Sequence, residues 1–159
     1  MSREQRKEVE NLIVEGLNAA EVPELAGSYF SLETMSEEQR AQLVEDHFLF
    51  KEGDRFLEAA GLNRDWPEGR GIYHNESKTF LVWINEEDQL RIISMEEGYN
   101  FIGVYARLTR AANSIEKIAA FARDDRLGYL TSCPTNLGTG LRISVHVELP
   151  FLGAEMEKL

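Results

Sequence analysis

Residues 141–149 place polar side chains at every second position, a spacing that could line a binding cleft. The polar members are Arg142, Ser144, His146 and Glu148, with apolar residues between them. A β-strand directs alternate side chains to opposite faces. The pattern therefore predicts a strand with one apolar face and one face that presents a guanidinium, a hydroxyl, an imidazole and a carboxylate. A half-exposed strand with a solvated polar face fits the same pattern.

A second group of chemical interest is an acid turn formed by Glu86, Glu87 and Asp88, with Arg91 shortly after it. The turn separates two apolar stretches that read as the strands of a hairpin. Consecutive acids at a hairpin tip are often no more than a solvated turn. Acids beside a strand arginine would also suit a site that binds a cationic guanidinium together with anionic phosphates.

The third group is the loop that contains Cys133, the only cysteine of the chain. A lone cysteine often serves as a small buried apolar residue. Cys133, however, follows a predicted strand and lies among Thr131, Ser132 and Thr135, whose hydroxyls and backbone amides could stabilise a thiolate. No histidine or aspartate lies close enough in the sequence to indicate a Cys/His nucleophile pair.

The elements that must position these groups are predicted from periodicity and turn residues. A helix over residues 3–20 has one apolar stripe, and Ser36 with Gln39 has the pattern of a helix start. The other predicted elements are helices over 55–60 and 101–119 and strands over 71–75, 79–85, 89–95, 127–131 and 141–149. Helices first and then mostly adjacent strands predict an α+β fold, an antiparallel β-sheet flanked by α-helices. No linker divides residues 1–159 into two domains.

Composition narrows the classes of function. The chain has 159 residues, 43% hydrophobic and 28% charged, with a net charge of −11. We expect a folded globular protein that binds neither nucleic acid nor a membrane. We find no signal peptide and no apolar stretch long enough to span a bilayer, and a single cysteine favours a cytoplasmic location. The spacing of His47, His74, His146 and Cys133 does not fit a zinc site, and no glycine-rich phosphate loop is present.

Several blocks of sequence resemble the catalytic domain of the phosphagen (ATP:guanidino) kinases, the family of arginine and creatine kinases. The blocks are residues 70–75 (RGIYHN), 78–83 (KTFLVW), 85–95 (NEEDQLRIISM) and 133–139 (CPTNLGT), with shorter ones at 46–50 and 65–67. The resemblance extends from about residue 27 to residue 152, and the blocks occur in the family's order.

The resemblance implies a role for each candidate residue. Glu87 would hold the guanidinium group and act as general base, and Cys133 would contact the same group as a thiolate. Arg91 and Arg142 would bind the ATP phosphates, and the acid turn and the polar strand face would become opposite walls of one cleft. The remaining nucleotide-binding residues would be His74, Ile143, Ser144, Val145 and His146. Mg²⁺ would arrive with ATP or ADP, so no protein metal ligand is expected.

The resemblance leaves the substrate and the extent of activity open. Residues 125–131 and Thr135 favour arginine as the guanidino substrate; taurocyamine, another guanidino compound or a protein arginine are alternatives. The family has phosphate-binding arginines before and after the region matched here. We therefore expect residues 1–159 to form part of a catalytic domain. The alternative to an active enzyme is a non-catalytic fragment that binds nucleotide weakly. The oligomeric state is left open.

Overall fold

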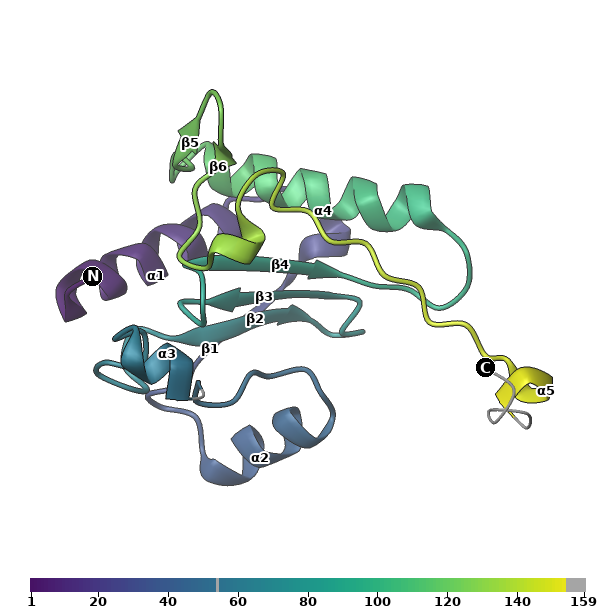
Figure 1. Ribbon diagram of the computed structural model, residues 1–159, viewed down its shortest axis with the longest axis horizontal. Coiled ribbons are helices and arrows are strands. Elements are labelled where there is room, and N and C mark those ends of the chain that lie inside the picture. The colour runs from purple at the N-terminus through teal and green to yellow at the C-terminus, as the bar shows by residue number, and fades with distance from the viewer. Residues whose placement is uncertain (54, 154–159) are drawn as a thin grey trace.

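The computed structural model describes residues 1–53 and 55–153 and places a four-stranded antiparallel sheet at the centre of the protein (Figure 1). Its strands follow one another in the order of the sequence: β1 (Gly27–Ser31), β2 (Gly71–Asn75), β3 (Phe80–Ile84) and β4 (Leu90–Ser94). In the register, Tyr73 lies opposite Tyr29 and Val82, and Val82 lies opposite Ile92. The predicted α+β class and the three predicted strands of residues 71–95 are confirmed.

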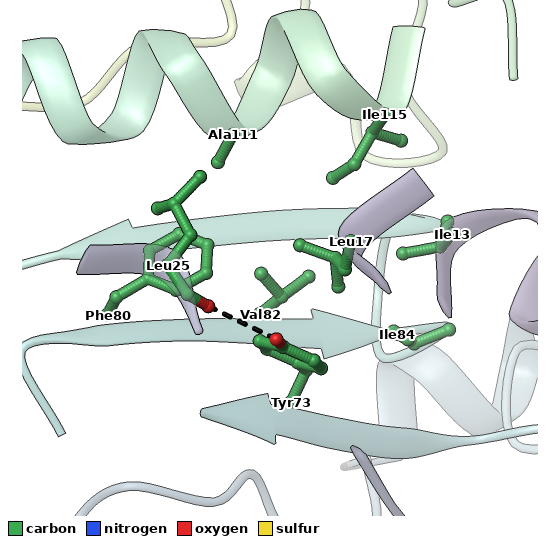
Figure 2. Close-up of a cluster of buried hydrophobic side chains, with 9 residues drawn as sticks. All are labelled: Ile13, Leu17, Leu25, Tyr73, Phe80, Val82, Ile84, Ala111 and Ile115. Atoms are coloured by element: carbon green, nitrogen blue, oxygen red, sulfur yellow. Dashed lines mark hydrogen bonds between the residues drawn. The ribbon is translucent and has the colours of Figure 1, made fainter. Parts of the chain in front are cut away.

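Two helices, α1 (Arg3–Asn18) and α4 (Phe101–Glu116), cover one face of this sheet. Figure 2 shows the core between them, in which Tyr73 also donates a hydrogen bond to the carbonyl oxygen of Leu25 at 3.1 Å. Its buried members are Ile13, Leu17, Leu25, Tyr73, Phe80, Val82, Ile84, Ala111 and Ile115. The helices touch closely at Gly16, where an added Cβ would lie 2.8 Å from the Cα of Ile115.

The opposite face of the sheet is covered by residues 32–50, which include α2 (Glu37–Glu45). Trp83 donates from its indole nitrogen to the carbonyl oxygen of Phe48 at 2.8 Å and so joins this cover to β3. The helix start predicted at Ser36 is confirmed, because Ser36 and Gln39 form a reciprocal capping box. The short helix α3 spans Arg55–Ala59.

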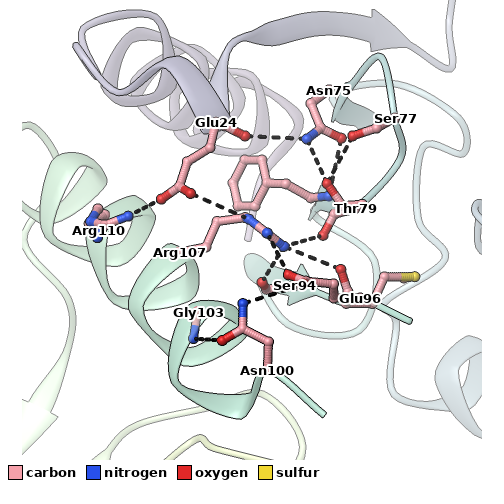
Figure 3. Close-up of polar contacts among 12 residues, drawn as sticks. Glu24, Asn75, Ser77, Thr79, Ser94, Glu96, Asn100, Gly103, Arg107 and Arg110 are labelled. Carbon is pink, nitrogen blue, oxygen red and sulfur yellow. Dashed lines mark hydrogen bonds and ion pairs between the residues drawn. The ribbon is translucent and has the colours of Figure 1, made fainter. Parts of the chain in front are cut away.

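Arg107 of α4 fixes the helix to the end of the β3–β4 hairpin that lies away from the acid turn (Figure 3). Its guanidinium donates to the carbonyl oxygens of Thr79 and Met95 at 3.3 and 3.2 Å and pairs with Glu96 at 3.1 Å. The side chain is 11% exposed, and its charge is met by carboxylate and carbonyl oxygens. This end of the hairpin is therefore structural.

The last third of the described chain departs from the predicted strands. It contains β5 (Arg123–Asp124), β6 (Gly128–Tyr129), a 3-10 helix over Pro134–Asn136 and α5 (Pro150–Gly153). The strand predicted over 127–131 is reduced to two paired residues. The strand predicted over 141–149 is wrong: these residues run unpaired and exposed beside the body of the protein. An alternating pattern gives a strand only where a neighbouring backbone supplies a ladder, and no such neighbour lies within the described residues.

No helix within the described ranges combines the length and the apolar character that crossing a bilayer requires.

Candidate functional site

The acid turn is the tip of the β3–β4 hairpin. Asn85 begins the turn in a left-handed conformation, with a φ of 55°, and its N–H donates to the carbonyl oxygen of Gln89 at 3.0 Å. Asparagine tolerates this backbone region better than most residues. The local sequence therefore closes the hairpin so that Glu86, Glu87 and Asp88 project together from one end of the sheet.

Within the turn, Glu86 and Arg91 form an internal pair. The carboxylate of Glu86 lies 3.7 Å from the guanidinium of Arg91, and the two side chains are 17% and 46% exposed. Burial raises the pKa of Glu86, while a backbone hydrogen bond and Arg91 act in the opposite direction. Arg91 also lies over the ring of Trp83, with 5.1 Å between the guanidinium carbon and the ring centroid. Arg91 is thus positioned from two sides and keeps part of its guanidinium open to solvent.

Asp88 joins the acid turn to the loop that contains Cys133. One oxygen of Asp88 accepts the backbone N–H groups of Ser132 and Cys133 at 2.5 and 3.3 Å. The other accepts the side-chain amide of Asn136 at 2.7 Å, and the same amide donates to Glu87 at 3.2 Å. Charge-assisted hydrogen bonds of this kind are stronger than neutral ones. The turn and the loop, far apart in the sequence, therefore form one unit.

The cysteine loop is also held by its own contacts. The sulfur of Cys133 lies 2.9 Å from the hydroxyl oxygen of Thr135, and the thiol is free and half-buried. Tyr129 and Gly138 exchange two backbone hydrogen bonds, at 2.8 and 3.2 Å, and so close the loop at its base. An added Cβ on Gly128 would lie 2.4 Å from the carbonyl oxygen of Gly138, so this close approach requires glycine.

A small cavity of about 130 Å³ opens beside this unit. Side chains of Glu86, Glu87 and Asp88 line it together with Ser132, Arg6 and Leu62. The three acidic residues of the lining outnumber its one arginine, Arg6, and so favour a cationic group over an anionic one. Cys133 is not among the lining residues, but it directly follows Ser132, which is.

His74 lies on β2, on the sheet face that also carries Arg91. His74 pairs with Leu81 and Arg91 pairs with Trp83 across the strands, and Leu81 and Trp83 are two residues apart on β3. The ring of His74 stacks on Phe30, with 4.9 Å between the centroids, and its Nδ1 lies 2.9 Å from the carbonyl oxygen of Asn75. The candidate nucleotide-binding residues His74 and Arg91 therefore share a face.

The other candidates are not brought to this unit. Arg142, Ile143, Ser144, Val145 and His146 all lie on the unpaired segment 141–149, and their side chains are exposed. Across residues 1–53 and 55–153, Arg142, Ser144 and His146 make no side-chain hydrogen bond or ion pair. The structure connects Glu87 to the Cys133 loop through Asn136 and pairs Arg91 with the neighbouring Glu86. The polar side chains of 141–149 have no partner among the residues that the structure describes.

A protein metal site would require several His, Cys, Asp or Glu side chains close together. In the part of the chain that the structure describes, no three His, Cys, Asp or Glu residues are grouped as they would be around a metal ion. The candidate phosphate ligands Arg91 and Arg142 are cations, which suit phosphate oxygens rather than a metal.

Three residues that connect the acid turn to other segments are not predicted from the sequence. It presents Asp88 only as part of an acidic turn, Asn136 only as part of a motif, and Asn85 only as a member of the block that begins the turn. Each acts through a contact with a distant segment, of which the sequence carries no local sign. An asparagine between an apolar strand and a run of acids is the only hint that the sequence gives of Asn85.

Comparison with known proteins places these features in a family. The family model described as ATP:guanido phosphotransferase, C-terminal catalytic domain, matches residues 8–159. The chain is 56% identical to the arginine kinase of Artemia franciscana and 57% identical to arginine kinase Lit v 2 of Penaeus vannamei. Both alignments cover 100% of this chain and 44% of the relative. The chain thus spans less than half the length of these curated relatives.

Solved structures give the same family. The duplicated taurocyamine kinase of Schistosoma mansoni with bound transition-state analogue components superposes with a TM-score of 0.88 at 51% identity, over 99% of this chain and 22% of that one. A lombricine kinase superposes with a TM-score of 0.79 at 45% identity, over 87% of this chain and 40% of that one. The matched domain model, the relatives' identities and the shared fold together show that this chain belongs to the ATP:guanido phosphotransferase family.

Proposed function

We propose that residues 1–159 form part of the catalytic domain of a phosphotransferase that moves the γ-phosphoryl group of ATP to the guanidinium group of arginine, and back. The observation that carries the proposal is the joining of the acid turn to the Cys133 loop through Asp88 and Asn136. Relatives that are 56–58% identical to this chain over the aligned residues are named arginine kinases, which supports arginine over other guanidino compounds.

In this proposal, Glu87 and Cys133 bind the guanidinium group. The carboxylate of Glu87 pairs with the guanidinium cation, holds its reacting nitrogen towards the γ-phosphate and accepts a proton from it. Asn136 donates to Glu87 at 3.2 Å and so restricts the orientation of that carboxylate. Cys133 contacts the guanidinium from the neighbouring loop. Phosphoryl transfer depends mainly on positioning and on neutralising charge, which are the tasks assigned to these residues.

The nucleotide is assigned to Arg91 and His74 and to the segment with Arg142, Ile143, Ser144, Val145 and His146. Arg91 would exchange its contact with Glu86 for phosphate oxygens, and the backbone of 143–146 would lie along the nucleotide. Magnesium bound to the phosphates would neutralise part of their charge and arrive with ATP. A cytoplasmic location is part of the same proposal, since ATP and a reduced thiol are both maintained there.

A coupled assay with Mg-ATP tests the activity and its substrate class. L-arginine, taurocyamine and lombricine are offered separately to the chain of residues 1–159. The proposal expects ADP release with L-arginine above the rate without a guanidino compound, and slower release with the other two. Equal rates with and without L-arginine would contradict it.

A second candidate, a fragment that binds nucleotide weakly without turnover, is favoured by one observation. Arg142, Ser144 and His146 are exposed on an unpaired segment, so the phosphate site is only partly assembled. Loss of charge-assisted contacts, each contributing about 1.5–3 kcal/mol, would weaken nucleotide binding. Calorimetric titration with Mg-ADP beside the coupled assay separates the two: binding without turnover supports the fragment, and turnover excludes it.

A further inference from the structure

Asn85 is the buried residue from which the acid turn projects. Its side chain is inside the protein, with 3% of the residue exposed, and its φ of 55° puts the backbone in the left-handed region. It follows the last residue of β3 and precedes Glu86 directly. A change in its conformation would therefore redirect the whole turn.

The side-chain amide of Asn85 connects the turn to two other segments. It donates to the carbonyl oxygen of Arg6 in α1 at 3.0 Å and to that of Gly69, just before β2, at 2.7 Å. The side-chain oxygen of Asn85 has no hydrogen-bond partner within the described residues. An unpartnered buried acceptor costs stability, so the donor half of the amide is the part that the fold uses.

Both acceptors are themselves fixed. The buried guanidinium of Arg6 pairs with Asp65 at 3.2 Å, which ties α1 to the loop of residues 61–70. An added Cβ on Gly69 would lie 3.0 Å from the side chain of Arg6, so loop and helix touch closely. Arg70 holds the same loop by donating to the carbonyl oxygens of Leu62, Arg64 and Glu68. Helix α1 and loop 61–70 together form a platform, and the amide of Asn85 is hydrogen-bonded to both parts of it.

From the turn, the restraint extends to the thiol. Asp88, three residues beyond Asn85 along the turn, accepts the backbone N–H of Cys133. We propose that Asn85 is a positioning residue: its amide fixes the acid turn to α1 and to loop 61–70, and thereby sets the placement of Glu87 relative to Cys133. This inference rests on the proposed function, because it takes Glu87 and Cys133 as the pair that binds the guanidinium group.

The single cysteine provides a readout that does not depend on turnover. Cys133 is the only thiol, so the rate at which iodoacetamide adds to the chain, followed by intact mass, reports the accessibility and ionisation of this one thiol, both of which depend on the placement of its loop. Asn85→Gly removes the amide and keeps the left-handed backbone free of strain. We expect alkylation at least about tenfold faster than in the wild-type chain, from the loss of two hydrogen bonds.

Asn75→Ala is the matched control. Asn75 is also buried, and its amide also bridges two partners, Glu24 and Thr79, but at the other end of β3. Its alkylation rate should stay within about twofold of wild type, although both variants lose stability. Wild-type reactivity in Asn85→Gly, or equal acceleration in Asn75→Ala, would overturn the proposal.

A second variant weakens the contact between the two parts of the platform, α1 and loop 61–70. Asp65→Asn breaks the ion pair with Arg6 while asparagine tolerates the left-handed φ of 58° at this position. Faster alkylation is expected here too, smaller than in Asn85→Gly, so the test stands even if Asn85→Gly does not fold. An unchanged alkylation rate in Asp65→Asn would contradict the claim that the platform restrains the Cys133 loop.

Kinetics then separates this inference from the proposed function. If the wild-type chain turns over, Asn85→Gly should lower kcat with L-arginine and leave the KM for Mg-ATP unchanged. Loss of kcat without any change in alkylation would contradict the positioning role. If the wild-type chain does not turn over, the proposed function fails, while the alkylation comparison still decides whether Asn85 controls the loop.

Discussion

The carboxylate of Asp88 accepts the backbone N–H of Cys133 at 3.3 Å and that of Ser132 at 2.5 Å. This contact joins the tip of a hairpin to a loop that lies 45 residues further along the chain. The acid turn and the backbone of the cysteine loop are therefore held together by the fold itself. Preorganisation of this kind reduces the cost of ordering a site when substrate binds.

Asp88→Asn should damage guanidinium binding rather than nucleotide binding. An asparagine offers one acceptor oxygen, so it cannot receive both the loop N–H groups and the Asn136 amide, and Glu87 loses its orientation. We expect the KM for L-arginine to rise about fivefold, the equivalent of about 1 kcal/mol, with the KM for Mg-ATP unchanged.

The control for this prediction is Asp124→Asn. Asp124 is an exposed aspartate that also accepts two backbone N–H groups, those of Arg126 and Leu127, outside the site. In steady-state kinetics, the KM values of Asp124→Asn for L-arginine and for Mg-ATP should equal those of the wild-type chain. An unchanged KM for L-arginine in Asp88→Asn would show that Asp88 does not support guanidinium binding.

Glu86 gives a prediction for stability against pH. Burial, the largest cause, raises the pKa of this carboxyl above its ordinary value of 4.5 in the folded protein. The folded state then holds the proton more tightly than the unfolded state. The contribution of the protonated Glu86 carboxyl to the free energy of unfolding is complete below pH 4.5 and is lost as the pH rises through the raised pKa. The free energy of unfolding of Glu86→Gln relative to wild type should therefore increase between pH 4.5 and neutral pH.

Urea unfolding at the two pH values measures this difference. Glu76→Gln, at an exposed position on the β2–β3 turn, serves as the control and should show no such trend. A difference for Glu86→Gln that stays constant or shrinks towards neutral pH would mean that the buried carboxyl does not carry the penalty.

Arg91→Ala should weaken the binding of Mg-ADP. Removing a guanidinium that bonds to phosphate costs about 1.5–3 kcal/mol, or about 10- to 150-fold in Kd, and Arg91→Lys should lie between alanine and wild type. Calorimetric titration gives the Kd values. Arg110→Ala, which removes an arginine of α4 that pairs with Glu24, should bind as wild type does. Equal Kd values for Arg91→Ala and Arg110→Ala would exclude Arg91 from the nucleotide site.

Gly16→Ala tests the contact between the two covering helices. Alanine usually stabilises a helix relative to glycine by about 0.5–1 kcal/mol. Here its Cβ would lie 2.8 Å from the Cα of Ile115, and overpacking of this kind costs about 1–3 kcal/mol. The melting temperature should therefore fall. Glu15→Ala, on the exposed side of the same helix, should leave it nearly unchanged, and a rise for Gly16→Ala would show that α1 and α4 can move apart freely.

Periodicity and turn chemistry were enough to predict the helices of residues 3–119 and the three strands of residues 71–95, because apolar spacing and turn residues are local features of the sequence. The strand β1 (Gly27–Ser31) was not predicted, since it forms by pairing with the distant strand β2. The segment 141–149 has an equally regular pattern and forms no strand, since pairing depends on another backbone and not on the segment's own residues. The prediction of Glu87, Cys133 and Arg91 as site residues rests on motifs that resemble a family. Asn85 and Asp88 act through long-range hydrogen bonds, which become visible only once the chain is folded.

The most direct test of the central claim is ³¹P NMR of the chain with Mg-ATP and L-arginine, for wild type and for Glu87→Gln. The exchange replaces the carboxylate by a neutral amide of nearly the same shape, so the fold and the contact with Asn136 are kept as far as possible. The account predicts a growing phosphoarginine signal with the wild-type chain and none above background with Glu87→Gln. No phosphoarginine from the wild-type chain, or equal amounts from both, would contradict it.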